Sequence, residues 1–148
     1  MAISGAKSSA YSMKNVSITI DGQLVNGLWD GDDAVQVAPL VDVGTMMVGA
    51  DGSSIFSAHA NEGATITVRL QHTSAAHRLL SQKLSRQRQT GCRDLGFPIQ
   101  IIDVCSNEGG SADQAFIQTA PNDQKGVNAA AREWVLVTGQ WMPEIPNP

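Results

Sequence analysis

Alternation of apolar and polar residues predicts several β-strands along this chain. Residues 64–70 give the clearest case, because every second residue is apolar and the residues between them are Thr or Arg. Residues 16–20 alternate in the same way, and the Asp-Gly pair at 21–22 is a turn signal that predicts a hairpin with residues 23–25. The chain is therefore expected to begin with β structure and to carry a half-buried strand near its middle.

The second half of the chain returns to the same pattern after one helical segment. Residues 97–105 and 113–120 are expected to form the two arms of a hairpin, and residues 133–141 the last strand. Residues 35–43 are also apolar, but Pro39 cannot donate to a ladder and predicts an edge, a bulge or a break there. The total is about six or seven strands.

One segment has helical spacing. Thr73 or Ser74 offers an N-cap, and Thr90-Gly91 offers a stop, so a helix is predicted over about residues 74–89. The apolar residues that recur at helical spacing within it are Ala76, Leu79, Leu80 and Leu84.

Residues 44–61 combine turn-forming residues with large apolar side chains. The apolar members are Met46, Met47, Val48, Ile55 and Phe56. We expect a long loop, and because long apolar loops are uncommon in compact domains, this one needs a partner surface. That surface is either a neighbouring subunit or the loop's own domain.

Composition predicts one compact, strand-rich domain over residues 1–148. The chain is 42% apolar and 16% charged, which is too apolar for disorder and too lightly charged for a coiled coil. The first residues lack the apolar run of a signal peptide, and no later stretch reaches the roughly 18 apolar residues that span a bilayer. We therefore expect synthesis in a cytoplasm, no membrane insertion, and reduced thiols at Cys92 and Cys105.

Charge is unevenly distributed along the sequence. Residues 1–68 and 94–148 each carry two basic and seven acidic residues, whereas residues 69–93 carry six basic residues and no acid. The six basic residues are Arg69, Arg78, Lys83, Arg86, Arg88 and Arg93. This segment is either a solvated helix face or a surface that attracts an anion, namely nucleic acid or an acidic surface on a second copy of the chain.

No motif for catalysis, metal binding or nucleotide binding occurs in the sequence. His59, His72 and His77 are not spaced as metal ligands and are expected at the surface or at an interface. Carboxylate pairs such as Asp51 with Glu62, or Asp103 with Glu108, lie beside Gly and Asn in the manner of turn formers. The sequence therefore assigns no catalytic residue, no metal and no cofactor.

The order of these elements resembles the tail tube proteins of contractile-tailed bacteriophages, over about residues 10–142. Three short motifs carry the resemblance: Gly49-Ala50-Asp51-Gly52, the strand Thr67-Val68-Arg69-Leu70, and the helix start Thr73-Ser74. Tyr11-Ser12 with Val16 near the beginning, and the strand with Trp134 near the end, also fit. Tailocin tubes and type VI secretion tubes are related.

The resemblance implies a mainly β fold, a β-sandwich or partly rolled barrel with one flanking helix. It implies that six copies close into a ring and that rings stack into a hollow tube through which DNA passes without specific binding. The expected partners are other copies of the chain, with a tail sheath, a baseplate and a tail terminator. The protein would then be a virion component made in the host cytoplasm, without enzymatic activity.

The resemblance also implies roles for individual residues. The segment 44–61 is expected to reach the next ring through Met46, Met47, Val48, Asp51, Ile55 and Phe56. The basic subunit interface is expected to include Arg69, Arg78, Lys83, Arg86 and Arg88. Arg69 would form a salt bridge to a neighbour or face the lumen, and Asp51 would either cap its loop or pair with a basic residue across the interface.

Three expectations remain. We expect a flexible segment at residues 1–10, and a Pro-rich tail at 142–148 that cannot continue a sheet. Of Trp134 and Trp141, one is expected in the core and the other at an interface.

The alternatives in function are a tube of a tailocin or type VI-like device, and a small nucleic-acid-binding module that uses residues 69–93.

Overall fold

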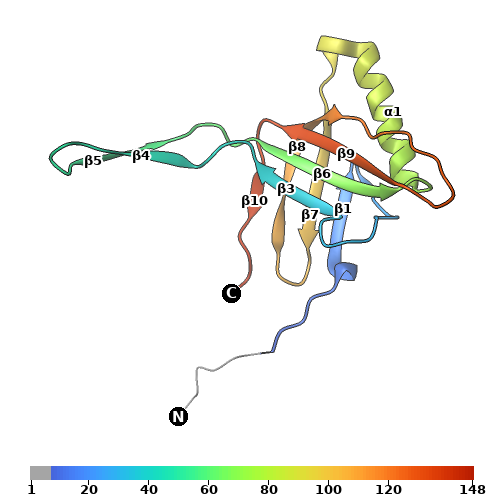
Figure 1. Ribbon diagram of the computed structural model, residues 1–148, viewed down its shortest axis with the longest axis horizontal. Helices are drawn as coiled ribbons and strands as arrows, with labels where there is room; N and C mark the ends of the chain where they lie inside the picture. Colours follow the sequence, from blue (N-terminus) through green and yellow to red (C-terminus); the bar gives the residue numbers. More distant parts are fainter. Residues whose placement is uncertain (1–7) are drawn as a thin grey trace.

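The computed structural model describes residues 8–148 as one curved sheet with a helix packed against it and a hairpin that projects from one end (Figure 1). The strands are β1 (Val16–Ile20), β2 (Gln23–Leu24), β3 (Val35–Pro39), β4 (Gly44–Val48), β5 (Ser54–Ala58), β6 (Ala64–Gln71), β7 (Phe97–Asp103), β8 (Glu108–Thr119), β9 (Ala131–Thr138) and β10 (Met142–Glu144). The helix α1 spans Ala75–Thr90, and short 3-10 turns lie at Met13–Asn15 and Gly91–Arg93.

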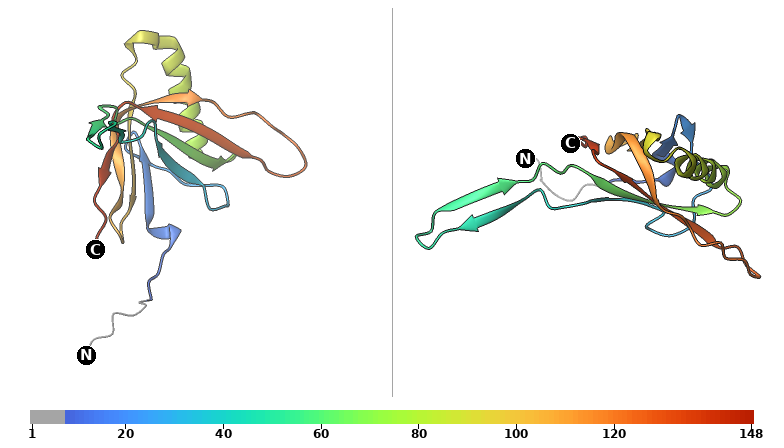
Figure 2. Two further views of the ribbon diagram at one scale, coloured as in Figure 1. Left: turned by 60° about the vertical axis from the view of Figure 1, so that its left-hand side comes forward. Right: turned by 90° about the horizontal axis from the view of Figure 1, so that it is seen from above.

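The main sheet has eight strands in the order β2-β1-β7-β8-β9-β6-β3, with β10 added beside β8. All neighbouring strands are antiparallel. The sheet curls strongly, but its end strands β2 and β3 do not pair with each other among the described residues, so the barrel stays open (Figure 2). The prediction of a mainly β, partly rolled fold with one flanking helix is confirmed.

The core lies on the face of the sheet that α1 covers. In β6 the residues Ala64, Ile66, Val68 and Leu70 are buried, while the residues between them are half-buried. Trp134 and Leu136 of β9 are buried beside them. Residues that lie opposite each other in neighbouring strands point to the same face of the sheet, so all these side chains lie on one face.

The helix is capped at both ends and bonded to the sheet through its last turn. The Ser74 hydroxyl accepts a hydrogen bond from the Ala76 amide at 3.1 Å, as an N-cap does. Gly91, at φ +56°, ends the helix in a conformation that favours glycine. The Gln87 side-chain amide bonds to both backbone groups of Ile117 at 3.0 Å, which locks α1 onto β8. The predicted helix, its cap and its stop are confirmed.

The structure corrects the expected loop at residues 44–61. The segment forms an antiparallel hairpin of β4 and β5, in which the turn-forming residues occupy only the tip. The Gly49 amide donates to the Ser53 carbonyl at 2.6 Å, and the Gly52 amide donates to the Gly49 carbonyl at 3.0 Å. The number of strands is higher than the predicted six or seven because of this hairpin and the short strand β10, whereas β2 is the predicted hairpin partner of β1.

The Pro-rich tail also differs from its prediction. Residues Met142–Glu144 form β10, in which Pro143 lies opposite Gly110 of β8. Proline is tolerated there because β10 is an edge strand that pairs on one side only. The predicted flexible segment 1–10 falls mostly on residues 1–7, which lie outside the described residues.

The two tryptophans separate as one core and one partly buried residue. Trp134 is buried in the core, whereas β9 ends at Thr138 and Trp141 lies beyond it. The Trp141 amide donates to the Glu62 carbonyl at 2.9 Å, and its ring lies against Gly110, where a side chain would clash. Within residues 8–148, no helix is both long and apolar enough to span a membrane.

Truncation of Leu80 tests the docking of α1. Leu80 is fully buried between the helix and the sheet, so Leu80→Ala should lower the free energy of unfolding by about 2–5 kcal/mol. The exposed neighbour Arg78 is the control, and Arg78→Ala should change it by less than about 0.5 kcal/mol. Urea unfolding of dilute protein measures both, and equal effects would contradict the described packing.

Candidate assembly site

The β4–β5 hairpin extends away from the body as a separate two-stranded sheet (Figure 2). Its five large apolar side chains are between 53% and 64% exposed. They are Met46, Met47, Val48, Ile55 and Phe56. The structure thus brings together all the residues predicted from the resemblance to reach another ring, together with Asp51 at the tip.

Both faces of the hairpin carry apolar side chains. Met46 lies opposite Phe56 on one face, and Met47 lies opposite Ile55 on the other. A Cβ at Gly44 would lie 2.3 Å from the Phe56 ring and 2.6 Å from the backbone carbonyl oxygen of Ser57, which favours glycine at that position. A two-stranded hairpin is marginally stable alone in water, and this one could bury both faces only between other surfaces.

Asp51 carries the only charge of residues 43–58. Its Oδ1 accepts a hydrogen bond from the Ser53 amide at 3.0 Å, which closes the turn. Hydrogen bonds from the backbone and the side chain of Ser53 lower the pKa of the Asp51 carboxyl, which therefore stays ionised. Asp51 thus caps its own turn, and its charge remains exposed to solvent.

An apolar groove of about 1140 Å³ opens at the base of the hairpin. Its apolar lining includes Val35, Val37, Val43, Ile101 and Trp141. Val35 and Val37 pair with core positions of β6, so the groove is the uncovered end of the core. Acidic residues of four different segments border it, namely Glu62, Asp103, Glu108 and Glu144.

Two of the predicted basic interface residues have partners within the chain. Arg69 lies 3.2 Å from a carboxylate oxygen of Asp33 and 3.2 Å from one of Glu133. Lys83 forms an ion pair with Asp21, and its side chain is only 16% exposed. These pairs tie β6 to the loop before β3 and α1 to the β1–β2 turn, so contacts of Arg69 and Lys83 with a neighbour stay a prediction.

The other three basic residues lie exposed on α1. Arg78, Arg86 and Arg88 have no acidic partner within residues 8–148. The helix and the hairpin lie apart in Figure 1, so the two predicted sets of site residues form separate surfaces. An interface role for these arginines stays a prediction.

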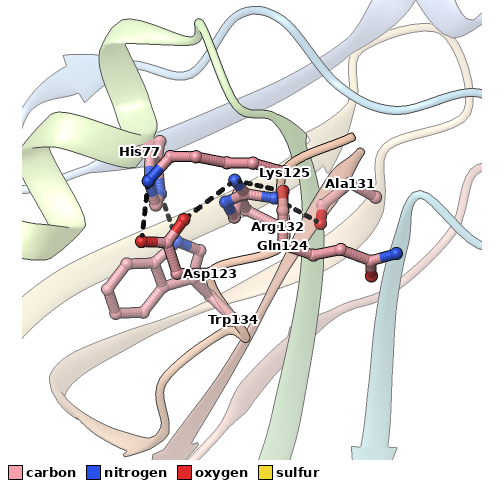
Figure 3. Close-up of polar contacts among 7 residues, drawn as sticks. All are labelled: His77, Asp123, Gln124, Lys125, Ala131, Arg132 and Trp134. Carbon is pink, nitrogen blue, oxygen red and sulfur yellow. Dashed lines mark hydrogen bonds and ion pairs between the residues drawn. The ribbon is translucent and has the colours of Figure 1, made fainter. Parts of the chain in front are cut away.

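A buried arginine, which the sequence analysis did not single out, holds the β8–β9 loop (Figure 3). Arg132 is 5% exposed, and its guanidinium donates to the Gln124 carbonyl at 3.0 Å. The same group lies 3.4 Å from Asp123, which also pairs with Lys125 at 3.1 Å. The only signal in the sequence is that Arg132 shares the inward phase of β9 with Trp134.

His77 continues this cluster from the first turn of α1. Trp134 Nε1 donates to His77 Nδ1 at 3.0 Å, which requires that this nitrogen carries no proton. Burial, and secondly the charge of Arg132, lower the pKa of His77, while Asp123 acts in the opposite direction. The neutral imidazole is therefore the form that fits this site.

The described residues include no group of three or more His, Cys, Asp or Glu side chains placed to hold a metal ion. Cys92 and Cys105 are free and exposed. The features that stand out among residues 8–148 are the exposed apolar side chains of the hairpin and the exposed arginines of α1.

Comparisons with known proteins agree with this character. The family described as the bacteriophage PhiTE tail tube protein matches residues 8–143. Structural protein ORF10 of Pseudomonas phage KPP10 is 29% identical over 136 residues, which cover 88% of this chain and 78% of that protein.

Solved structures from three kinds of particle share the fold. The tube-terminating cap of the anti-feeding prophage has a TM-score of 0.60 at 14% identity, covering 97% of this chain and 98% of that one. The sheath/tube terminator of an extracellular contractile injection system, PVC, has a TM-score of 0.62 at 9% identity, covering 95% and 100%. A chain of a gene transfer agent virion has a TM-score of 0.58 at 16% identity, covering 90% and 98%.

The His77 site predicts a dependence of stability on pH. Because the folded protein binds the His77 proton less tightly than the unfolded chain, the free energy of unfolding should fall as the pH drops from about 7 to about 5. His77→Asn keeps an acceptor for Trp134 without titrating, so the fall should become smaller. Urea unfolding across this range measures it. His72→Asn removes only the smallest of the contributions that lower the pKa of His77, so it is the control and should keep most of the fall. An unchanged slope in His77→Asn would contradict the assignment.

Proposed function

The chain belongs to the family of the bacteriophage PhiTE tail tube protein, and we propose that it is a structural subunit of a phage tail tube in which hexameric rings stack into a conduit for DNA. The observation that carries this proposal is the hairpin with large apolar side chains exposed on both faces. Burial of such side chains stabilises by about 1.5–3 kcal/mol each. A neighbouring ring supplies surfaces on both sides of the hairpin.

The open sheet supports lateral closure into a ring. The end strands β2 and β3 each have one side without a strand partner among the described residues. Unpaired edges invite pairing with another chain, and closure of a ring removes them. In the proposed tube, the strands of neighbouring subunits meet around the axis.

Charge supports passage of DNA without binding. The net charge of −4 suits a lumen that repels phosphate, and the exposed arginines of α1 then face outward or toward another subunit. The proposed partners are other copies of the chain, a tail sheath, a baseplate and a tail terminator. The protein would act in the virion after synthesis in the host cytoplasm, without catalysing a reaction.

A tube terminator is a second candidate, because two of the structures with this fold are described as a tube-terminating cap and as a sheath/tube terminator. A terminator stops growth after one ring, whereas a tube subunit stacks without limit. A tube of a tailocin or of a type VI-like device would assemble by the same stacking of rings. The length distribution of assemblies separates the terminator from all of these.

A nucleic-acid-binding module is the alternative of another class. It has less support, because Arg69 and Lys83 of the basic segment 69–93 already have acidic partners in the chain. Such a module would stay monomeric, and its affinity for DNA would fall steeply with added salt.

Negative-stain imaging and sedimentation of purified protein test the proposal. The protein should form hollow tubes of variable length, whereas Met47→Glu and Phe56→Glu should stay folded and fail to form tubes, because a charge cannot be buried between rings. Leu95→Glu, at an exposed apolar residue outside the hairpin, is the matched control and should form tubes. Single rings would favour the terminator, and normal tubes from both hairpin variants would refute the role of the hairpin.

A further inference from the structure

We propose that the tip of the hairpin docks on the opposite end of a second copy of this chain, where Lys125 of the β8–β9 loop and His72 are exposed. This inference rests on the proposed stacking of rings. It names the receiving surface, which we call the loop-end surface: His72, Pro121, Asp123, Lys125 and Val127.

The position of the two surfaces follows from β6. The hairpin joins β6 at Ala64, and the loop-end surface begins at the other end of that strand, where His72 follows Gln71. Along the longest axis of the molecule, the hairpin and the β8–β9 loop are at opposite ends (Figure 1). Copies that repeat head to tail along this axis place the hairpin of one copy against the loop end of the next.

The loop-end surface contains a pocket of about 400 Å³. Trp134, Leu84, Ala120 and Pro121 supply its apolar lining. Val127 at the tip of the loop is fully exposed, which offers a further apolar contact for the hairpin. The hydrogen bonds of Arg132 hold the loop in place before any partner arrives, which lowers the entropy cost of docking.

Charge favours docking of the hairpin on the loop-end surface over docking on the acidic loop nearby. The hairpin brings one carboxylate, that of Asp51. Beside the pocket, the exposed Lys125 and the buried Arg132 share the single acid Asp123, so this cluster keeps one net positive charge and Lys125 is its accessible cation. Another loop lies near the same end of β6, where the Trp29 amide donates to the Arg69 carbonyl. The residues that follow Trp29 are acidic, namely Asp30, Asp32 and Asp33. That side repels the Asp51 carboxylate.

Cysteine cross-linking locates the contact directly. In a background of Cys92→Ser and Cys105→Ser, Ala50→Cys places a thiol at the hairpin tip and Val127→Cys places one on the loop. Oxidation of the double-cysteine protein should give a ladder of dimers, trimers and longer chains in non-reducing gels, because each copy links to two others. Either cysteine alone should give at most dimers.

The control pairs Ala50→Cys with Leu95→Cys, an exposed position outside the loop-end surface, and should give no ladder beyond dimers. Absence of a ladder from the Ala50→Cys, Val127→Cys protein overturns the inference. Imaging of the same sample shows whether the proposed function fails with it: tubes without a ladder mean that the hairpin docks elsewhere, and no tubes mean that stacking itself is wrong.

A charge exchange tests the role of Asp51 separately. Asp51→Asn keeps the acceptor for the Ser53 amide, so it should raise the critical concentration for tube formation by only about two- to fivefold, the scale of one exposed ion pair. Asp51→Lys should raise it further, and Lys125→Glu in the same chain should restore part of the loss. No restoration by Lys125→Glu would refute the electrostatic part of the inference.

Discussion

The structure depends on one constraint: a two-stranded hairpin that has large apolar side chains on both faces cannot bury them on its own body. One face carries Met46 and Phe56, and the other carries Met47 and Ile55. Packing one face against the body would therefore still leave the other face exposed to water. A segment of this kind persists in a folded protein when association buries it. The rest of the chain can be understood as a scaffold that holds this arm in place.

The body achieves its stability without the arm. Its core is continuous across the neighbouring strands β1, β7, β8, β9 and β6, and α1 closes it through Leu80 and through the paired hydrogen bonds of Gln87 to Ile117. Because β3 and β6 enter the hairpin directly from the core, the arm is anchored at two strands. Substitutions in the arm and in the body should therefore act on different properties, the first on association and the second on folding.

Local signals in the sequence predicted the elements that depend on local chemistry. The cap at Ser74, the stop at Gly91 and the alternation of β6 each arise within a few residues, and the structure has all three. The hairpin was missed as strands because apolar residues on both faces show no alternation. Ion pairs such as Arg69 with Asp33, 36 residues away, and the hold of Arg132 on its loop depend on the tertiary fold, which no local pattern encodes.

The position of the arm at one end of the long axis has a consequence for growth. A filament built from such subunits is directional: bare hairpins cover one terminus, and bare loops cover the other. The two termini then differ in chemistry: the first presents apolar side chains with one carboxylate, and the second presents a pocket beside Lys125. In the proposed head-to-tail tube, nucleation and arrest would therefore call for two dissimilar adaptors, and neither could substitute for the other.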